Sequence, residues 1–336
     1  MNRNQDPSDG REALCGTDAG LRRSTDREAP IRPDEPTVSV VLPTYDRASV
    51  LGGAVESVFE QTHAPLELIV VDGGSTDGTV DVLDAIDDDR LRVLRREAPD
   101  GPSASRNAGI RAAAGDLVAF VDDDDRWRPE KLRRQVDALA REDASASLTR
   151  VTKADGEPRT RTGVSGDVYE AIRRLDLPTY TSTLVARRSA LGEVGGFDES
   201  LGCFEDWELC LRLARERAFA FVDEPLVVKG TGQGNISAEP DRLARAFDRL
   251  DRRYDLPRTA RARFLADVGM THCEAGRIDE GIPHLIRSLR LDPTRAKVAI
   301  ALALALAASV AGTATPFTGG MDRVYGIERS LGRWRA

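Results

Sequence analysis

Four consecutive aspartates, Asp122 to Asp125, are the clearest sign of chemistry in the sequence. They directly follow the apolar run LVAFV and precede RWRP, so the carboxylates stand at the end of an expected strand. Like charges packed in this way repel one another unless a cation or solvent compensates them, and carboxylate oxygens suit Mg²⁺ or Mn²⁺. An ion held through one or two carboxylates keeps open positions for phosphate oxygens and can neutralise a departing diphosphate. The alternative is a solvated acidic turn that caps a helix beginning at Pro129.

Two other apolar runs also end in residues that suit a nucleotide. The run TVSVVL (37–42) is followed by PTYDR, which offers a ring, hydroxyls and a carboxylate to a base and ribose. The run LELIVV (66–71) is followed by DGGSTDG, in which the glycines allow a tight backbone and Asp72 points toward the same crevice. Arg106, in SASRNAGI, can place a cation near a phosphate or a base. Taken alone, the two loops also fit ordinary turns, and Arg106 also fits a surface charge on a helix.

The apolar pattern predicts the elements that position these side chains. Strands are expected at 37–42, 66–71, 91–94 and 117–121, separated by helical patterns near 49–61, 75–86 and 103–114. This alternation predicts an α/β fold, with a Rossmann-like, mostly parallel sheet that has helices on both faces and a ligand site at the carboxyl ends of its strands. Further strands near 145–151, 183–186 and 219–222, and a helix at 205–215, complete a domain that spans 37–237.

Net charge and cysteine content narrow the classes of protein. The 336-residue chain has a formal net charge of −8, which argues against nucleic acid as a partner. Its four cysteines form no C-x-x-C pair, so reduced thiols in the cytoplasm are expected instead of a zinc site or a disulfide framework. Residues 1–36 lack an apolar segment and are expected to form a disordered leader, not a signal peptide.

Residues 238–336 have a helical pattern and are expected to form a C-terminal helical appendage. Within it, 275–293 looks like one helical-repeat hairpin. The stretch 298–314 is almost wholly Ala, Val, Leu and Ile and lies at the lower length limit for crossing a bilayer. Because basic residues flank this stretch, it is expected either to make peripheral contact with an anionic membrane or to be a buried core helix.

Six motifs occur in one order along the chain: PTYDR, VDGGSTDGT, SASRNAGI, FVDDDDRWRPEKL, GGFDES and FEDWELCLRL. With them, residues 37–237 resemble the family 2 glycosyltransferases of the GT-A fold. The resemblance implies a nucleotide-sugar donor and a Mg²⁺ or Mn²⁺ cofactor with Asp124 as the main metal ligand. It directs Asp122 and Asp123 toward the ribose. It also assigns the following residues to the nucleotide site or its vicinity: Pro43, Thr44, Tyr45, Asp46, Asp72 and Arg106.

Asp206 matches the catalytic base of that family. An inverting single displacement needs one carboxylate that takes the proton from the acceptor hydroxyl, so that attack occurs opposite the diphosphate. Without the other motifs, Glu205 and Asp206 would be an ordinary acidic start of a helix. Trp207 fits either a wall facing the sugar or a buried indole.

Two positions depart from the family pattern. Gly73 stands where relatives often have a second carboxylate that contacts uracil, and the segment KGTGQGNIS (229–237) lacks the histidine that many of them have. Lys229 could contact the diphosphate in place of that histidine, or could simply be solvated. These departures leave the identity of the base and the third metal contact open.

The expected function is that of an inverting, metal-dependent glycosyltransferase at the inner face of the cell membrane. The donor is expected to be a UDP-sugar, and the acceptor a glycan, a lipid-linked glycan or a polyprenyl phosphate. A sugar nucleotidyltransferase is a second hypothesis, but PTYDR is not the Gly-rich, basic loop that such an enzyme needs for a triphosphate. A catalytically inactive sugar-nucleotide-binding or membrane scaffold protein is a third, and the acidic run together with Asp206 argues against it.

Overall fold

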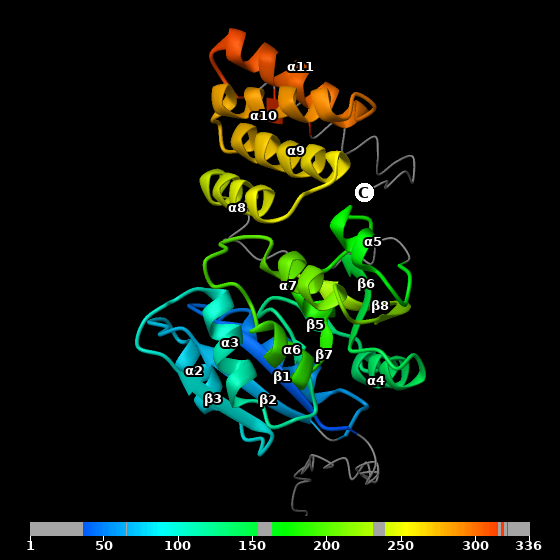
Figure 1. Ribbon diagram of the computed structural model, residues 1–336. Coiled ribbons are helices and arrows are strands. Elements are labelled where there is room, and N and C mark those ends of the chain that lie inside the picture. The colour runs from blue at the N-terminus through cyan, green and yellow to red at the C-terminus, as the bar shows by residue number, and fades with distance from the viewer. Residues whose placement is uncertain are drawn as a thin grey trace, which may run out of the picture. The chain divides into compact units, whose positions relative to one another are not determined.

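A single eight-stranded sheet organises the N-terminal two thirds of the computed structural model (Figure 1). The structure describes residues 36–64, 66–153, 163–230, 239–314, 317, 318 and 321. Almost all of the expected leader and most of KGTGQGNIS lie outside these residues. Across the sheet the strands follow the order β3 (Leu91–Arg95), β2 (Leu66–Asp72), β1 (Val38–Thr44), β4 (Leu117–Phe120), β7 (Val185–Arg187), β6 (Ala146–Lys153), β8 (Phe219–Lys229) and β5 (Arg126–Trp127).

The first four strands in this order run parallel, and β7 reverses the direction. Strand β6 is antiparallel to β7 and parallel to β8, and the short β5 is antiparallel to β8. The carboxyl ends of β1, β2 and β4 therefore meet at one edge of the sheet, which is where an open α/β sheet binds its ligand. The predicted mostly parallel sheet is confirmed.

Helices cover both faces of the sheet, and the strands alternate between two apolar cores. Val41 and Ile69 face one core, whereas their neighbours Val40 and Leu68 face the other. Burial on both faces explains why these strands are continuous apolar runs in the sequence. One core contains residues of α1 (Leu51–Phe59), α2 (Thr79–Asp84) and α4 (Lys131–Arg141). The other contains residues of α3 (Pro102–Ala112), α5 (Tyr169–Arg173), α6 (Arg188–Val194) and α7 (Glu205–Ala214).

Strand β8 is much longer than the expected 219–222. The polar residues Asp223 and Glu224 and then Pro225 interrupt its apolar pattern, and the register with β6 shifts at Arg150 opposite this point. Beyond the irregularity the strand resumes pairing and ends at Lys229. The two-residue strand β5, inside the loop after the acidic run, pairs with Val227 and Val228. Pairing across the sheet, which the local sequence does not encode, thus brings the end of β8 to the acidic run.

The helices that follow, within the described residues 239–314, are α8 (Pro240–Arg253), α9 (Arg258–Glu274), α10 (Ile278–Leu291) and α11 (Ala296–Ala311). Each packs against the next (Figure 1). Helices α9 and α10 approach closely because both have a glycine at the contact: a Cβ at Gly281 would lie 2.6 Å from the carbonyl oxygen of Gly269. Side chains of α8 and α9, including Phe247, Leu250 and Phe264, belong to the same core as α7.

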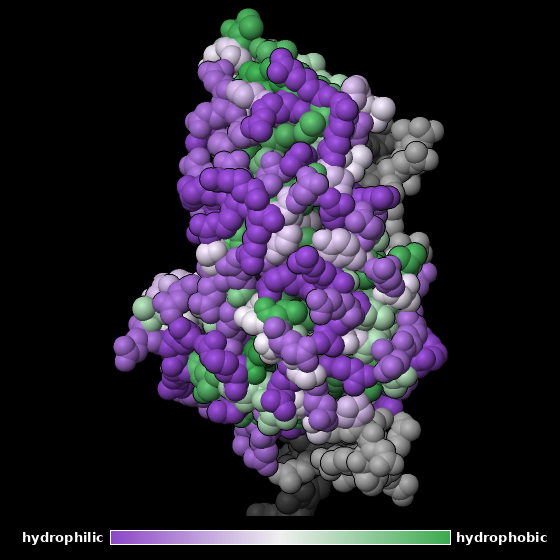
Figure 2. Space-filling model, viewed as in Figure 1, coloured by the Kyte–Doolittle hydropathy of each residue, from purple (hydrophilic) through white to green (hydrophobic). Residues whose placement is uncertain are grey.

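Helix α11 is buried on one side only. Val298, Ala301, Ala305 and Ala308 pack into a core with α9 and α10, while Val310 on the outer side is 92% exposed. Figure 2 shows apolar surface over this helix within a largely hydrophilic face. Among the described residues, no helix combines the length and hydropathy needed to span a bilayer. Peripheral membrane contact through residues 298–314 stays a prediction.

Candidate active site

The first carboxylate of the acidic run, Asp122, lies between two cations. Arg106 of α3 donates from Nη2 at 2.8 Å, and Nζ of Lys229, the last residue of β8, lies 3.2 Å away. Burial opposes ionisation of Asp122, but the charges of Lys229 and Arg106 outweigh burial and hold its pKa well below the usual range. Asp122 is therefore ionised and already compensated by the protein's own cations.

The last carboxylate of the run, Asp125, is fully buried and joins β8 to the acidic run. Its oxygens accept from Nζ of Lys229 at 2.7 Å and from the backbone N–H of Gly230 at 3.0 Å, and the Ser182 hydroxyl also donates to it. Gly230 must be a glycine, since a Cβ there would overlap the carbonyl of Asp124. Of the two possibilities for Lys229, simple solvation is not observed, because its side chain is 17% exposed and holds two aspartates.

The two middle carboxylates differ from each other in their partners. Asp123 is buried, accepts from the Thr44 hydroxyl at 3.0 Å and faces Nε of Arg47 at 3.5 Å. Burial raises its pKa to about 6, although Arg47 works against this shift. Asp124 is half-buried, and its carboxylate has no hydrogen-bond or ion-pair partner among the described residues. Of the four aspartates, Asp124 is thus the one left free to bind a ligand.

The loops after β1 and β2 are bound to each other. Asp46 accepts from the backbone N–H of Thr76 at 2.7 Å, and its own N–H donates to the Ser75 hydroxyl at 2.9 Å. Asp46 has a left-handed backbone with φ of 52°, which brings its carboxylate and N–H to the second loop. Asp72 is buried and accepts from the Ser75 N–H at 3.1 Å, while Tyr45 beside it is 45% exposed. Pro43 is in register with Val71, so residues 43–46 and 72–77 form one wall.

Asp206 lies in the first turn of α7, where helix N–H groups favour a carboxylate. Its Oδ1 accepts from the Trp207 N–H at 2.7 Å. Burial raises the pKa of Asp206 to about 7, and the negative charge of Glu205 adds to the shift. A carboxyl group with this pKa is poised to exchange a proton near neutral pH.

Arg106 connects the acidic run with the start of α7. Its guanidinium donates from Nη2 to Asp122 at 2.8 Å and from Nη1 to Glu205 at 3.0 Å, and its side chain is only 6% exposed. Burial alone would lower the pKa of Arg106, but the two carboxylates raise it, so the residue stays charged. The next residue, Asn107, binds the carbonyl and the N–H of Phe197 and so fixes the GGFDES segment. The buried side chain of Arg106 therefore links the end of β4 to the helix that carries Asp206.

A family model described as glycosyl transferase family 2 matches residues 39–197, which include β1, β2, β4, Arg106 and the acidic run. These residues belong to glycosyl transferase family 2. Among curated relatives, TuaG of Bacillus subtilis (strain 168), named for teichuronic acid biosynthesis, is 36% identical over 37% of this chain and 51% of its own length. The Escherichia coli glucosyltransferase WfgD, named for UDP-Glc and α-D-GlcNAc-diphosphoundecaprenol, is 32% identical over 33% of this chain and 44% of its own. The chain spans about half or less of the length of these relatives.

Solved structures of low sequence identity have the same fold. Residues 1–349 of S. aureus TarS in complex with UDP-GlcNAc align with a TM-score of 0.56 and 19% identity, over 89% of this chain and 93% of that one. A mannosyltransferase from Pyrobaculum calidifontis, in complex with GDP-Man and Mn²⁺, aligns with a TM-score of 0.54 and 21% identity, over 91% of this chain and 89% of that one. The predicted GT-A fold is confirmed.

Several polar residues of this family 2 site could not be assigned from the sequence. Ser182 lies in a short 3-10 turn (Thr181–Thr183), where its hydroxyl accepts from the Asp122 N–H at 3.1 Å and donates to Asp125. No local pattern marks it. Trp207 is a buried indole, 2% exposed, whose Nε1 donates to the Ile172 carbonyl at 2.7 Å. Of the two possibilities for Trp207, the buried one is therefore observed.

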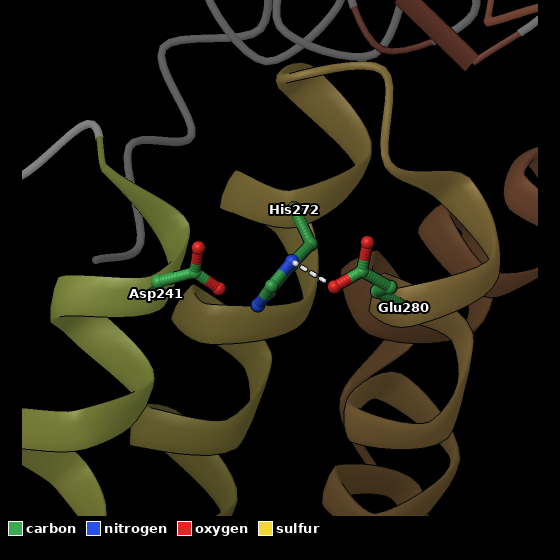
Figure 3. Close-up of side chains that lie close together, drawn as sticks. All are labelled: Asp241, His272 and Glu280. Carbon is green, nitrogen blue, oxygen red and sulfur yellow. Dashed lines mark ion pairs between the residues drawn. The ribbon is translucent and has the colours of Figure 1, made fainter.

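A second group of titratable residues lies among the C-terminal helices. Asp241, His272 and Glu280 face one another, with ligand atoms all within 4.8 Å (Figure 3). The guanidinium of Arg277 donates to both oxygens of Asp241, at 2.8 and 2.9 Å, and to both oxygens of Glu280. The protein's own cation thus compensates this group, and it clamps α8 to α10.

Proposed function

We propose that this chain is an inverting glycosyltransferase that moves a sugar from a nucleotide-diphosphate donor, expected to be a UDP-sugar, to a hydroxyl or phosphate of an acceptor. One observation carries the proposal: the buried Arg106 binds both Asp122 and Glu205, so the acidic run and the start of α7 lie within reach of a single guanidinium. A donor bound at the carboxyl ends of β1, β2 and β4 would then have its reacting carbon near Asp206.

The wall formed by the first two loops is the proposed nucleotide site. The exposed ring of Tyr45 offers a surface for a base, and the loop carboxylates and hydroxyls can bind ribose. Asp122 and Asp123 lie at the adjoining strand end, toward the ribose, and Arg106 adds a positive charge beside them. The residues in this role are Pro43, Thr44, Tyr45, Asp46, Asp72, Arg106, Asp122 and Asp123.

The acidic run fits the expected Mg²⁺ or Mn²⁺ cofactor at one position. Asp122 and Asp125 are neutralised by Lys229 and Arg106, whereas Asp124 has a free, half-buried carboxylate. A hard cation needs only one or two carboxylates in addition to the phosphate oxygens of its substrate. We therefore assign Asp124 as the metal ligand. When bound, the ion would supply positive charge to the departing diphosphate.

Asp206 is the proposed general base. It accepts the proton of the acceptor oxygen as that oxygen bonds to the anomeric carbon and the bond from this carbon to the diphosphate breaks on the opposite side. The product therefore has the inverted anomeric configuration, and the proton resides on the Asp206 carboxyl group. A pKa near 7 lets Asp206 be largely ionised before the reaction at slightly alkaline pH and still accept a proton during it.

The acceptor is proposed from the relatives and from the last helix. WfgD is named for a lipid-linked acceptor, α-D-GlcNAc-diphosphoundecaprenol, and TuaG for teichuronic acid biosynthesis. The exposed apolar side of α11 is compatible with work beside a membrane. We accordingly propose a glycan, lipid-linked or polyprenyl-phosphate acceptor and a reaction at the inner face of the cell membrane.

The stereochemical outcome tests the proposal. Purified protein is incubated with Mn²⁺, a nucleotide sugar and either undecaprenyl diphosphate-linked GlcNAc or undecaprenyl phosphate, and the anomeric configuration of the product is read by NMR. UDP-glucose, UDP-GlcNAc and GDP-mannose serve in turn as donors. Transfer with inversion supports the proposed function. Retention of configuration would exclude the single displacement, and the absence of both donor binding and transfer would favour an inactive scaffold protein.

A further inference from the structure

Helix α7, which carries Asp206, is held in place by the helices that follow it in the chain. Phe264 of α9 packs edge-to-face against Phe204, with ring centroids 4.6 Å apart and planes at 79°. The same ring packs against Trp207, with centroids 5.4 Å apart and planes at 83°. Phe204 and Trp207 flank Glu205 and Asp206 in the sequence. One aromatic side chain of α9 thus contacts both ends of the segment that contains the proposed base.

A second residue beyond the family 2 match also binds α7. The hydroxyl of Tyr254, just after α8, donates a hydrogen bond to Glu208. Glu208 is fully buried and also accepts a hydrogen bond from Nε of Arg212 at 2.9 Å. The Tyr254 ring packs against Trp207, with centroids 6.1 Å apart. The C-terminal helices therefore hold α7 through polar and aromatic contacts.

The backbone at the start of α7 explains why this support matters. Phe204 has φ of 62° and ψ of 18°, a left-handed conformation that is disfavoured for a bulky residue. Such a conformation persists only where the surroundings hold it. A phenylalanine side chain has no group that could cap the helix by a hydrogen bond, so packing has to supply the restraint. The direction in which Glu205 and Asp206 leave this turn then depends on the ring of Phe264.

We propose that Phe264 is a positioning residue for Asp206, so that the C-terminal helices complete the active site. This inference rests on the proposed function, since it assigns Phe264 a role in transfer through the base. A displacement of a reacting group by about 1 Å can lower a rate by about 100-fold, so loss of this support need not unfold the protein to abolish efficient transfer.

Two measurements on the full chain separate positioning from stability. The first is hydrogen exchange of the peptide spanning 204–210. The second is the Mn²⁺-dependent release of nucleotide from UDP-glucose, UDP-GlcNAc or GDP-mannose in the presence of the two undecaprenyl acceptors named above, divided by the concentration of sites that bind UDP or GDP in a calorimetric titration. This normalisation removes any unfolded fraction. The variants are Phe264→Ala, Phe264→Leu and, as a control, Leu285→Ala, which removes a fully buried side chain from the separate core of α9, α10 and α11.

Phe264→Ala is expected to speed exchange in 204–210 and to lower the normalised turnover by about 10- to 100-fold with little change in the nucleotide Kd. Phe264→Leu, which keeps an apolar side chain at this place, should recover most of the turnover, and Leu285→Ala should leave both readouts unchanged. Unchanged exchange and turnover in Phe264→Ala, or equal effects of Leu285→Ala, would overturn the proposal. If the unmodified protein turned over no donor, the proposed function would fail, and exchange alone would decide the positioning role in the same way.

Discussion

Two clusters in this protein place an arginine between two carboxylates, yet they have different consequences. In the C-terminal helices, Arg277 donates to every oxygen of Asp241 and Glu280, on the partly exposed side of a helix bundle. At the sheet edge, the buried Arg106 binds one oxygen each of Asp122 and Glu205. Two neighbouring acids have no such partner: Asp124 pairs with no cation among the described residues, and burial raises the pKa of Asp206. A cluster whose acids are all paired is a structural clamp. The cluster at the sheet edge keeps one carboxylate, Asp124, free to bind a ligand and a second, Asp206, able to accept a proton, so it can take part in catalysis.

The largest expected effect concerns the protonatable acid. Asp206→Asn keeps the shape of the side chain but removes its ability to accept a proton, so transfer should fall by about 10²–10⁴-fold. Binding of the nucleotide should be retained, because the proposed nucleotide wall belongs to other loops. The check is the transfer rate at saturating donor together with the calorimetric Kd. Near-normal transfer would remove Asp206 from the role of base.

The two arginines should differ in their effect on stability. Arg106→Gln removes the buried guanidinium that pairs with the half-buried Glu205, and breaking a buried ion pair typically costs about 3–5 kcal/mol in the free energy of unfolding. Arg277→Gln should cost clearly less, because solvent screens the exposed partners of Arg277. Urea denaturation of both variants measures the difference. Equal losses would contradict the distinction between a buried bridge and an exposed clamp.

The free acid should control the response to metal. Asp124→Ala is expected to make nucleotide binding insensitive to Mn²⁺, because the remaining carboxylates of the run already have partners. Asp241→Ala, in the other cluster, serves as the control and should leave the Mn²⁺ effect intact. Calorimetric titration of UDP with and without Mn²⁺ is the measurement. The same Mn²⁺ effect in Asp124→Ala and the unmodified protein would refute the assignment of the ligand.

The smallest expected effect is a shift in pH dependence. Asp206 must be ionised to accept a proton, so kcat/KM should rise with pH through an apparent pKa near 7. Burial is the main cause of this raised pKa and the charge of Glu205 the second, so Glu205→Gln should move the rise to lower pH without abolishing it. Glu216→Gln, at an exposed position after α7, is the control. A profile that does not move in Glu205→Gln would separate Glu205 from the ionisation of Asp206.

The parts of the fold with local signals could be predicted from the sequence. Strands buried on both faces are continuous apolar runs, so β1, β2 and β4 were evident, and the order of strands and helices implied the parallel half of the sheet. The short β5 and the second half of β8 depend on pairing with each other across the sheet. Because Asp223, Glu224 and Pro225 interrupt the apolar pattern of β8, the sequence does not reveal either segment as a strand.

In the candidate site, too, residues with a local sequence signal could be predicted and residues that depend on distant contacts could not. The acidic run, Asp72 and Asp206 lie at the ends of strands or helices, where functional residues are expected. The order of the six motifs along the chain was enough to predict them as site residues. The partners that distinguish the four aspartates come from distant segments: Lys229 is 104 residues from Asp125, and Ser182 is 57 residues from it. The role of Phe264 likewise depends on packing between α9 and α7. Contacts of this kind require the folded structure.

Calorimetric titration of the unmodified protein with UDP and with GDP, each with and without Mn²⁺, tests the proposed nucleotide-sugar site most directly. A nucleotide site built from two loops and an acidic run with one free carboxylate predicts binding of one nucleotide, expected to be UDP, that tightens when Mn²⁺ is present. Failure of both nucleotides to bind, with and without the ion, would contradict the assignment of this edge of the sheet as a nucleotide-sugar site.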